Sequence, residues 1–173
     1  MQSANDISVR PHWLRVVLIG RRPKATLIRI AVLVVACFVT FKFILLPIRI
    51  EGISMQPTFR DGQINCVNRL AYFRHEPQRG DIVSVRLAGP SISYMKRIIG
   101  LPGEKVSFHE GHAFINGRLL DEPYVKFACD WEHEPIACGP TQYYVVGDNR
   151  SMPFNDHKQG RAERDHIIGK SIL

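Results

Sequence analysis

Ser54 and Lys96 are the two residues whose types and surroundings could form a hydrolytic pair. A serine hydroxyl is a weak nucleophile, so it needs exposure at a turn and a base that takes its proton. Ser54 lies in the turn-like stretch 51–59, EGISMQPTF, and Lys96 lies among apolar residues in 93–100, SYMKRIIG. Burial disfavours the charged form of a lysine, as a base near neutral pH requires. An ordinary charged strand edge at Lys96 and Arg97 is the non-catalytic alternative.

Histidine is the more usual base for a serine nucleophile, and the chain has seven histidines. His12 precedes the longest apolar run and is separated from Ser54 by it. The others lie in polar, turn-like stretches with no partner fixed by the sequence: His75, His109, His112, His133, His157 and His166. A Ser–His–Asp triad stays open as an alternative, because the members of a triad come together only in space.

The longest apolar run, 30–48, reads IAVLVVACFVTFKFILLPI and has Lys42 as its only charge. Its length suits a hydrocarbon core that is roughly 30 Å thick, so we predict a transmembrane helix over 30–48. A cleaved signal peptide and a buried core helix are the alternatives. The run is longer than the usual apolar centre of a signal peptide, and no small-x-small exit precedes Pro47.

Basic residues gather before this run, where acidic residues are nearly absent. The positive-inside rule therefore predicts a basic cytoplasmic segment, 1–29, and an extracytoplasmic domain, 49–173. The 173 residues suffice for one compact domain and an appendage. The net charge of +7 alone could suggest a nucleic-acid partner. The chain shows no aromatic-basic RNA signature, zinc-finger spacing or heptad repeat, so we expect no nucleic-acid partner.

Period-two patterns dominate after the apolar run and predict a mostly β, antiparallel domain. The expected strands lie in QINCVNRL, GDIVSVRL, SYMKRIIG, EKVSFHEGHAFINGRLL and QYYVVGD. Glu110-Gly111 and Asn116-Gly117 predict hairpin turns within the fourth of these segments. The tail from His157 is expected to start with a helical turn and to end in a strand through Ile167 and Ile168.

Cys129 and Cys138 lie close together in a loop-like segment, ACDWEHEPIACG. An oxidising compartment would permit a disulfide between them, and we expect that state ahead of free thiols. A zinc site that includes His133 is the weaker alternative, because neither a CxxC motif nor a second ligand pair is present. We therefore expect no metal and no cofactor. Cys37 belongs to the apolar run, and Cys66 is expected in the core.

Four motifs follow the apolar run in a fixed order: SMQPT (54–58), RGDIVSV (79–85), YMKRIIGLPGE (94–104) and VVGDNRSM (145–152). In this order they resemble the bacterial type I signal peptidase (leader peptidase) family. The resemblance covers most of residues 50–170. It implies a membrane-anchored peptidase with an antiparallel β-sheet catalytic domain and a Ser–Lys dyad.

The resemblance also implies a role for individual residues. The motif serine falls on Ser54, the nucleophile, and the motif lysine falls on Lys96, the base. Met55, beside the nucleophile, and Phe59 are expected to face the substrate and the membrane. Asp81 and Arg97 are expected in the scaffold, and Asp148 and Asn149 are expected near the site.

Two departures from the family pattern concern the groups around the dyad. Many members have a serine two positions before the nucleophile, and its hydroxyl helps to bind the oxyanion; this chain has Gly52 there. The Ser54 N–H is then the firmer donor. The fourth motif usually continues to a serine and an aspartate. Here Ser151 comes early and Asp156 comes late, and either could orient Lys96.

The expected function is the removal of signal peptides from exported preproteins at the bacterial inner membrane. The expected partners are therefore signal peptides and the lipid bilayer. A specialised maturation peptidase of a conjugation or secretion system is an alternative with the same dyad. An inactive, membrane-anchored assembly protein is the alternative from a different class.

Overall fold

The computed structural model describes residues 23–86, 93–127, 129–157 and 159–172. The chain divides into two compact units, Met1–Lys42 and Phe43–Leu173. Most of the predicted basic segment, residues 1–22, lies outside the described residues.

The N-terminal unit contains helix α2 (Pro23–Val39), which continues into the π-helix η1 (Thr40–Ile44). The stretch Lys24–Ile44 has 21 residues and is long and apolar enough to cross a membrane. The helical stretch differs from the predicted span, 30–48, at both ends, and the span across a membrane stays a prediction. The helix begins at Pro23, because proline is compatible with the first helical position, so residue 30 lies inside it. Residue 48, the end of the predicted span, falls on a strand.

That strand, β1 (Leu45–Arg49), pairs antiparallel with β2 (Ile64–Asn68). It lies at the edge of its sheet, where Pro47 can be tolerated because proline donates no ladder hydrogen bond. The apolar run thus serves two elements, first the helix and then the first strand of the second unit.

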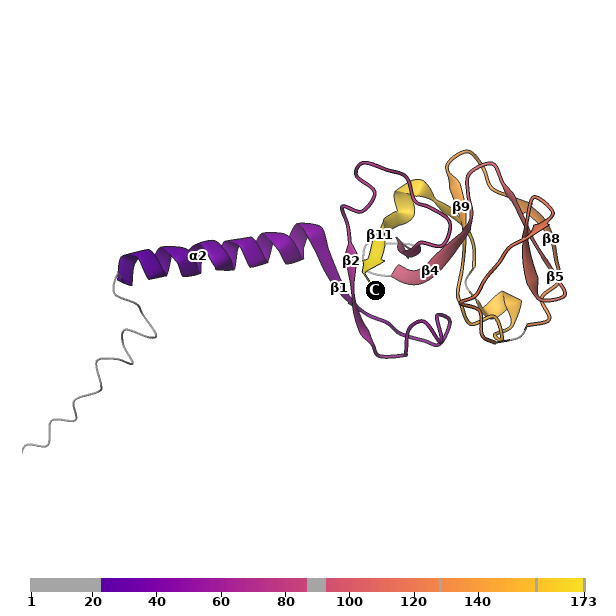
Figure 1. The fold of residues 1–173 in the computed structure, drawn as a ribbon, viewed down its shortest axis with the longest axis horizontal. Coiled ribbons are helices and arrows are strands. Elements are labelled where there is room, and N and C mark those ends of the chain that lie inside the picture. The colour runs from indigo at the N-terminus through magenta and orange to yellow at the C-terminus, as the bar shows by residue number, and fades with distance from the viewer. Residues whose placement is uncertain (1–22, 87–92, 128, 158, 173) are drawn as a thin grey trace, which may run out of the picture. The chain divides into compact units, whose positions relative to one another are not determined.

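Two antiparallel sheets form the second unit, which confirms the predicted mostly β fold (Figure 1). The seven-stranded sheet has the order β1, β2, β11 (Ile167–Ile172), β3 (Ile82–Arg86), β4 (Ser93–Gly100), β9 (Gln142–Val146) and β10 (Gly160–Glu163). The four-stranded sheet has the order β7 (Arg118–Leu119), β6 (His112–Ile115), β5 (Lys105–His109) and β8 (His133–Ala137). Every expected strand segment is present, and β8 is an additional strand in the segment interpreted as a loop.

Turn chemistry explains the tight connections of the smaller sheet. Both residues of Glu110-Gly111 have positive φ, 48° and 76°, and those of Asn116-Gly117 have φ of 51° and 78°. These are the left-handed conformations that two-residue hairpins require, so both turn predictions are confirmed.

In β2 the buried residues differ from the ones that the apolar pattern predicted. Asn65 and Val67 are buried, whereas Ile64 is 75% exposed and Cys66 is only half-buried. The tail ends in β11 as predicted. Its helical turn, η2 (Phe154–Asp156), comes just before His157.

The core of the second unit consists of three apolar clusters. One contains Phe108, Trp131 and Tyr144. A second lies around Val83, Ile98 and Val145. The third contains the residues that support the Ser54 turn: Ile50, Met55, Phe59, Val67, Ile82 and Met95.

Cys129 and Cys138 are free thiols, which corrects the expected disulfide. The Cys129 thiol donates to the Gly111 carbonyl at 2.9 Å. Cys138 is buried in the first cluster, where desolvation raises the pKa of its thiol. Each sulfur therefore has a separate environment. Among the described residues, no group of three histidine, cysteine or acidic side chains could hold a metal.

Candidate active site

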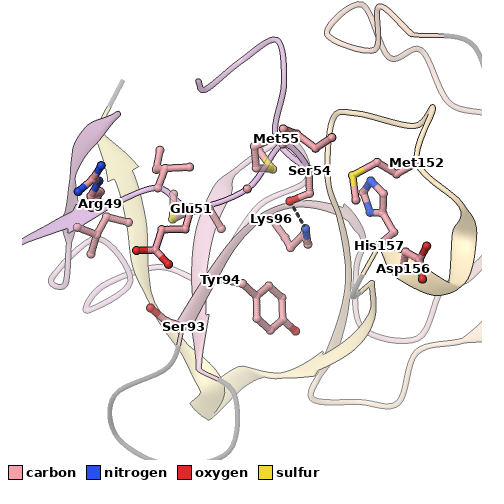
Figure 2. A pocket seen from close by; sticks show the side chains of 15 residues that line it. Arg49, Glu51, Ser54, Met55, Ser93, Tyr94, Lys96, Met152, Asp156 and His157 are labelled. Carbon is pink, nitrogen blue, oxygen red and sulfur yellow. Dashed lines mark hydrogen bonds between the residues drawn. The ribbon is translucent and has the colours of Figure 1, made fainter. Parts of the chain in front are cut away.

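Ser54 and Lys96 lie in direct contact: Lys96 Nζ donates to Ser54 Oγ at 2.6 Å (Figure 2). Lys96 projects from β4, which has β3 on one side and β9 on the other, and it is only 2% exposed. The Tyr94 ring centroid lies 5.8 Å from its Nζ atom. A serine hydroxyl in contact with a buried amine is an arrangement in which the amine can take the hydroxyl proton.

The turn that carries Ser54 is held by backbone hydrogen bonds at its base. Ile50 N–H donates to the Gln63 carbonyl at 2.9 Å, and Gly62 N–H donates to the Ile50 carbonyl at 2.8 Å. Gly52 N–H donates to Asp61 Oδ1 at 2.8 Å, and its φ is +93°. Gly52 offers no side-chain donor for an oxyanion. Its left-handed conformation sets the direction of the chain just before Ser54.

Met55 and Phe59 are 2% and 1% exposed, so both side chains point into the unit, and their contact with substrate and membrane stays a prediction. They anchor the turn because their side chains pack in the third apolar cluster. Met55 also lines the groove beside Ser54, whereas Phe59 does not. A methionine in a serine turn has the same sequence pattern whether it points outward or inward, so only the packing reveals its direction.

The turn after β9 packs against the Ser54 backbone from the other side. Asn149 N–H donates to the Ser54 carbonyl at 3.0 Å, and Asn149 Nδ2 donates to the Ile53 carbonyl at 3.1 Å. A Cβ atom at Gly147 would lie 2.1 Å from the Ser54 carbonyl oxygen. The glycine is therefore required by close backbone approach, and Asn149 joins the two turns.

Asp148 ties the same turn to β4. Arg97 Nε and Nη2 donate to its two carboxylate oxygens at 2.8 and 2.7 Å, and Thr58 Oγ1 also donates to it. Burial acts to lower the pKa of Arg97, but the pairing with Asp148 raises it overall. Since Arg97 follows Lys96 directly, this ion pair fixes the strand that carries Lys96.

Asp81, the other scaffold residue of the motifs, directly precedes β3. Its carboxylate contacts Lys170 Nζ at 2.6 Å and accepts from Tyr72 Oη at 2.9 Å. Burial would raise the pKa of Asp81, but these hydrogen bonds lower it overall. It therefore links the start of β3 to β11.

A second buried ion pair, between Arg150 and Glu122, was not identified from the sequence. Arg150 is fully buried, donates from Nε to the Gly147 carbonyl at 3.0 Å, and contacts Glu122 with both terminal nitrogens. Tyr124 Oη donates to Glu122 at 2.8 Å, and the Tyr124 ring lies 3.9 Å from the Arg97 guanidinium. The two ion pairs are thus linked through Tyr124.

Ser151 and Asp156, the two residues expected to orient Lys96, are both exposed and lie in the segment after β9. Ser151 Oγ donates to Asn149 Oδ1 at 2.7 Å, so its hydroxyl supports the turn. Asp156 lines the groove. The fully buried neighbour is His157, which the sequence placed in a polar stretch with no partner. Figure 2 shows His157 and Asp156 on the same side of the groove as Met152.

The dyad opens into a groove with a volume of about 630 Å³. Ser54, Lys96, Met152 and His157 line it, and the charged side chains along it are Arg49, Glu51 and Asp156. An extended peptide could enter such a groove and bring a carbonyl group to Ser54.

Comparisons with known proteins show which family the chain belongs to. A family model described as "Signal peptidase, peptidase S26" matches residues 24–173. Signal peptidase IB of Staphylococcus aureus (strain N315) is 33% identical over 162 residues, which is 83% of this chain and 84% of that protein. Probable signal peptidase I-2 of Synechocystis sp. is 31% identical over 130 residues, 72% of this chain and 60% of that protein.

A crystal structure of a signal peptidase I from Enterococcus faecalis V583 shares 25% identity, with a TM-score of 0.45. It covers 56% of this chain and 97% of its own. The family-model match over 24–173 and the one-third identity to the Staphylococcus aureus protein decide the assignment. The chain belongs to the signal peptidase S26 family.

Proposed function

We propose that this chain removes N-terminal signal peptides from exported preproteins, with Ser54 as the nucleophile and Lys96 as the general base. The 2.6 Å contact between Lys96 Nζ and Ser54 Oγ is the single observation that carries this proposal. Family membership supplies the class of substrate. The burial of Lys96 supports its role, because a buried amine loses the hydration that favours its charged form.

The reaction follows from these groups. Neutral Lys96 takes the Ser54 proton while Oγ attacks the scissile carbonyl carbon, and the Ser54 N–H stabilises the oxyanion. The C–N bond then breaks, and Lys96 gives its proton to the leaving amine. Water, deprotonated by Lys96, attacks the acyl-enzyme in the second half of the reaction. The carboxyl product leaves, and Ser54 regains its proton.

The neighbouring residues have supporting roles in this proposal. Met55 lines the groove next to Ser54, so we assign it to the pocket for the residue before the cut. Asp148 and Asn149 hold the nucleophile turn and the base strand together. Gly52 supplies only its backbone conformation, so the Ser54 N–H is the principal oxyanion donor.

The direct test is cleavage of a preprotein that has alanine one and three positions before the cut, incubated with the detergent-solubilised full chain. Wild-type protein should release the shortened product. Ser54→Ala and Lys96→Ala should each lose processing almost completely, since nucleophile and base act as a unit. Ser93→Ala is the matched control, because Ser93 is another serine of the same groove. Processing by Ser54→Ala at the wild-type rate would refute the dyad.

We also propose that Lys24–Ile44 spans the bacterial inner membrane once and leaves the peptidase unit on the extracytoplasmic side. In a cysteine-free background, a thiol probe that cannot cross membranes should label Gln63→Cys in cells whose outer barrier is permeabilised. It should label Ser3→Cys only after the cells are broken. Labelling of Ser3→Cys in unbroken cells, or recovery of a shortened soluble form, would overturn this orientation.

A further inference from the structure

His157 is a buried side chain of the site for which the dyad chemistry has no use. It follows η2, is fully buried, and packs edge-on against the Trp131 ring with a centroid distance of 4.9 Å. It lines the same groove as Ser54 and Lys96. A buried polar ring beside a catalytic pair requires hydrogen-bond partners, and these partners indicate its role.

Both ring nitrogens of His157 face the backbone of the turn after β9. Nε2 lies 2.7 Å from the Asn149 carbonyl oxygen, so Nε2 carries the proton and donates. Nδ1 accepts from the Gly147 N–H at 3.4 Å. The ring therefore bridges the two ends of Gly147–Asn149, whose middle residue is Asp148. Neither nitrogen is directed at Ser54 Oγ, so His157 is not the base of a serine triad.

The charged groups around His157 favour its neutral form. Lys96 from β4 and Arg150 from the turn oppose a positive charge on the ring, whereas Asp148 favours one. Desolvation by burial is the largest cause, and the net effect lowers the pKa of His157 from 6.5 to about 4. Protonation would also place an N–H at Nδ1 opposite the Gly147 N–H, two donors facing each other. The bridge exists only with a neutral ring.

The bridged turn is the one that fixes the nucleophile. Asn149 donates to the Ser54 and Ile53 carbonyl groups, and Gly147 lies so close that an added Cβ would meet the Ser54 carbonyl and His157 Cε1. A shift of this turn would displace the Ser54 peptide. Ser151 and Asp156, the residues that the motif pattern favoured for orienting the dyad, are both exposed.

We propose that neutral His157 is a positioning residue, which clamps the Gly147–Asn149 turn against the Ser54 peptide and so keeps Ser54 Oγ aligned with Lys96. This inference rests on the proposed function. It assigns to His157 the supporting role that the sequence pattern placed on Ser151 or Asp156.

The test compares two substitutions of His157 in the full chain, with cleavage of the same preprotein as the assay. His157→Phe keeps an aromatic ring against Trp131 but has no nitrogen. We expect kcat to fall roughly 10- to 100-fold with KM little changed, since small misplacement of a reacting group costs about this much. His157→Gln retains an N–H donor for the Asn149 carbonyl and should recover most of the lost kcat. His133→Phe is the matched control, because His133 also stacks on an aromatic ring, that of Phe154.

A second measurement does not depend on cleavage. Long-range 1H–15N NMR of histidine-labelled protein should show the Nε2–H tautomer of His157 at pH 6. A Nδ1–H tautomer or a charged ring at that pH would overturn the clamp, as would equal kcat values for His157→Phe and wild type. If His157→Phe fails to fold, the Gln variant and the tautomer decide. A wild-type protein that leaves the preprotein uncut refutes the proposed function instead, and the tautomer still tests the clamp.

Discussion

The two walls of the groove are held by different kinds of interaction. The Ser54 wall, residues 50–59, rests on the third apolar cluster through Met55 and Phe59. The turn wall, residues 147–157, contains four buried polar side chains: Asp148, Asn149, Arg150 and His157. One wall is thus supported mainly by packing and the other mainly by hydrogen bonds and ion pairs.

This difference assigns different tasks to the walls. Apolar burial is strong but non-directional, so it stabilises the Ser54 wall without setting the exact orientation of its backbone. Hydrogen bonds are directional, and the turn wall reaches across to the Ser54 carbonyl through Asn149. We infer that the Ser54 wall contributes mostly stability and that the turn wall contributes mostly alignment.

The largest expected effect is at Lys96, the proposed general base, which lies between the two walls. Lys96→Arg keeps a long, basic side chain at this position, but a guanidinium stays protonated and cannot accept the Ser54 proton as neutral Lys96 does. Processing should fall by at least about 1,000-fold. Lys105→Arg, at an exposed position of β5, is the control and should cleave normally. Appreciable cleavage by Lys96→Arg would indicate that a histidine is the base.

Asp148→Asn tests the turn wall. It leaves Arg97 without the carboxylate that holds it through two hydrogen bonds, and breaking a buried ion pair costs about 3 to 5 kcal/mol. The free energy of unfolding, measured by urea denaturation, should drop by this amount, and cleavage should fall as well. Asp165→Asn, at an exposed site, should change little. A loss of less than about 1 kcal/mol at Asp148 would contradict the importance of the ion pair.

Phe59→Ala tests the Ser54 wall. Removal of a buried phenylalanine side chain costs about 3 to 5 kcal/mol, because it loses apolar burial and leaves a cavity. The same denaturation experiment on Phe73→Ala provides the control, since Phe73 is 80% exposed while Phe59 is 1% exposed. Equal stabilities for the two variants would show that Phe59 is not packed as described.

Acid should weaken the turn wall specifically. His157 has a lowered pKa, about 4 against 6.5, so its contribution is complete above pH 6.5 and is lost as the pH falls through 4. Over that window the loss amounts to about 3 kcal/mol of unfolding free energy. His157→Gln should flatten the pH dependence of stability between pH 6.5 and 4. His166→Gln, which replaces an exposed histidine, should leave it unchanged.

The smallest expected effect is at Gly52. Its φ is +93°, and an added Cβ would meet nothing within 4 Å, so Gly52→Ala carries only a backbone cost of about 1 kcal/mol. Gly103, with φ of +80° and equally open space, is the matched control for stability. Only Gly52→Ala should also slow cleavage, because it tilts the chain that leads to the Ser54 N–H. Identical cleavage by both variants would show that the conformation of Gly52 does not affect the Ser54 N–H as an oxyanion donor.

Local patterns in the sequence sufficed for much of the fold. Alternating apolar residues predicted the strands, and Asn116-Gly117 predicted a hairpin because few other dipeptides adopt positive φ at both positions. The order of the four motifs singled out Ser54 and Lys96. Their contact joins β4 to the turn at 51–59 and is made only in the folded chain.

Features that depend on distant contacts could not be predicted. The apolar run ends as a strand because β2 pairs with it. Pro47 disfavours a helix interior, but the strand that 45–48 joins is defined only by this pairing. Met55 and Phe59 point inward because a cluster receives them. The side chains of Arg150 and Glu122 meet only after folding.

The sequence by itself therefore determined the family motifs, the β architecture, the apolar helix and the two residues of the proposed dyad. The tertiary structure alone decided which polar groups are buried around that dyad. Burial and pairing are properties of space, and they turn a histidine from a polar segment into a neutral bridge. A chain can encode such a bridge only through the elements that enclose it, since both partners of the His157 ring, Gly147 and Asn149, lie in the turn after β9.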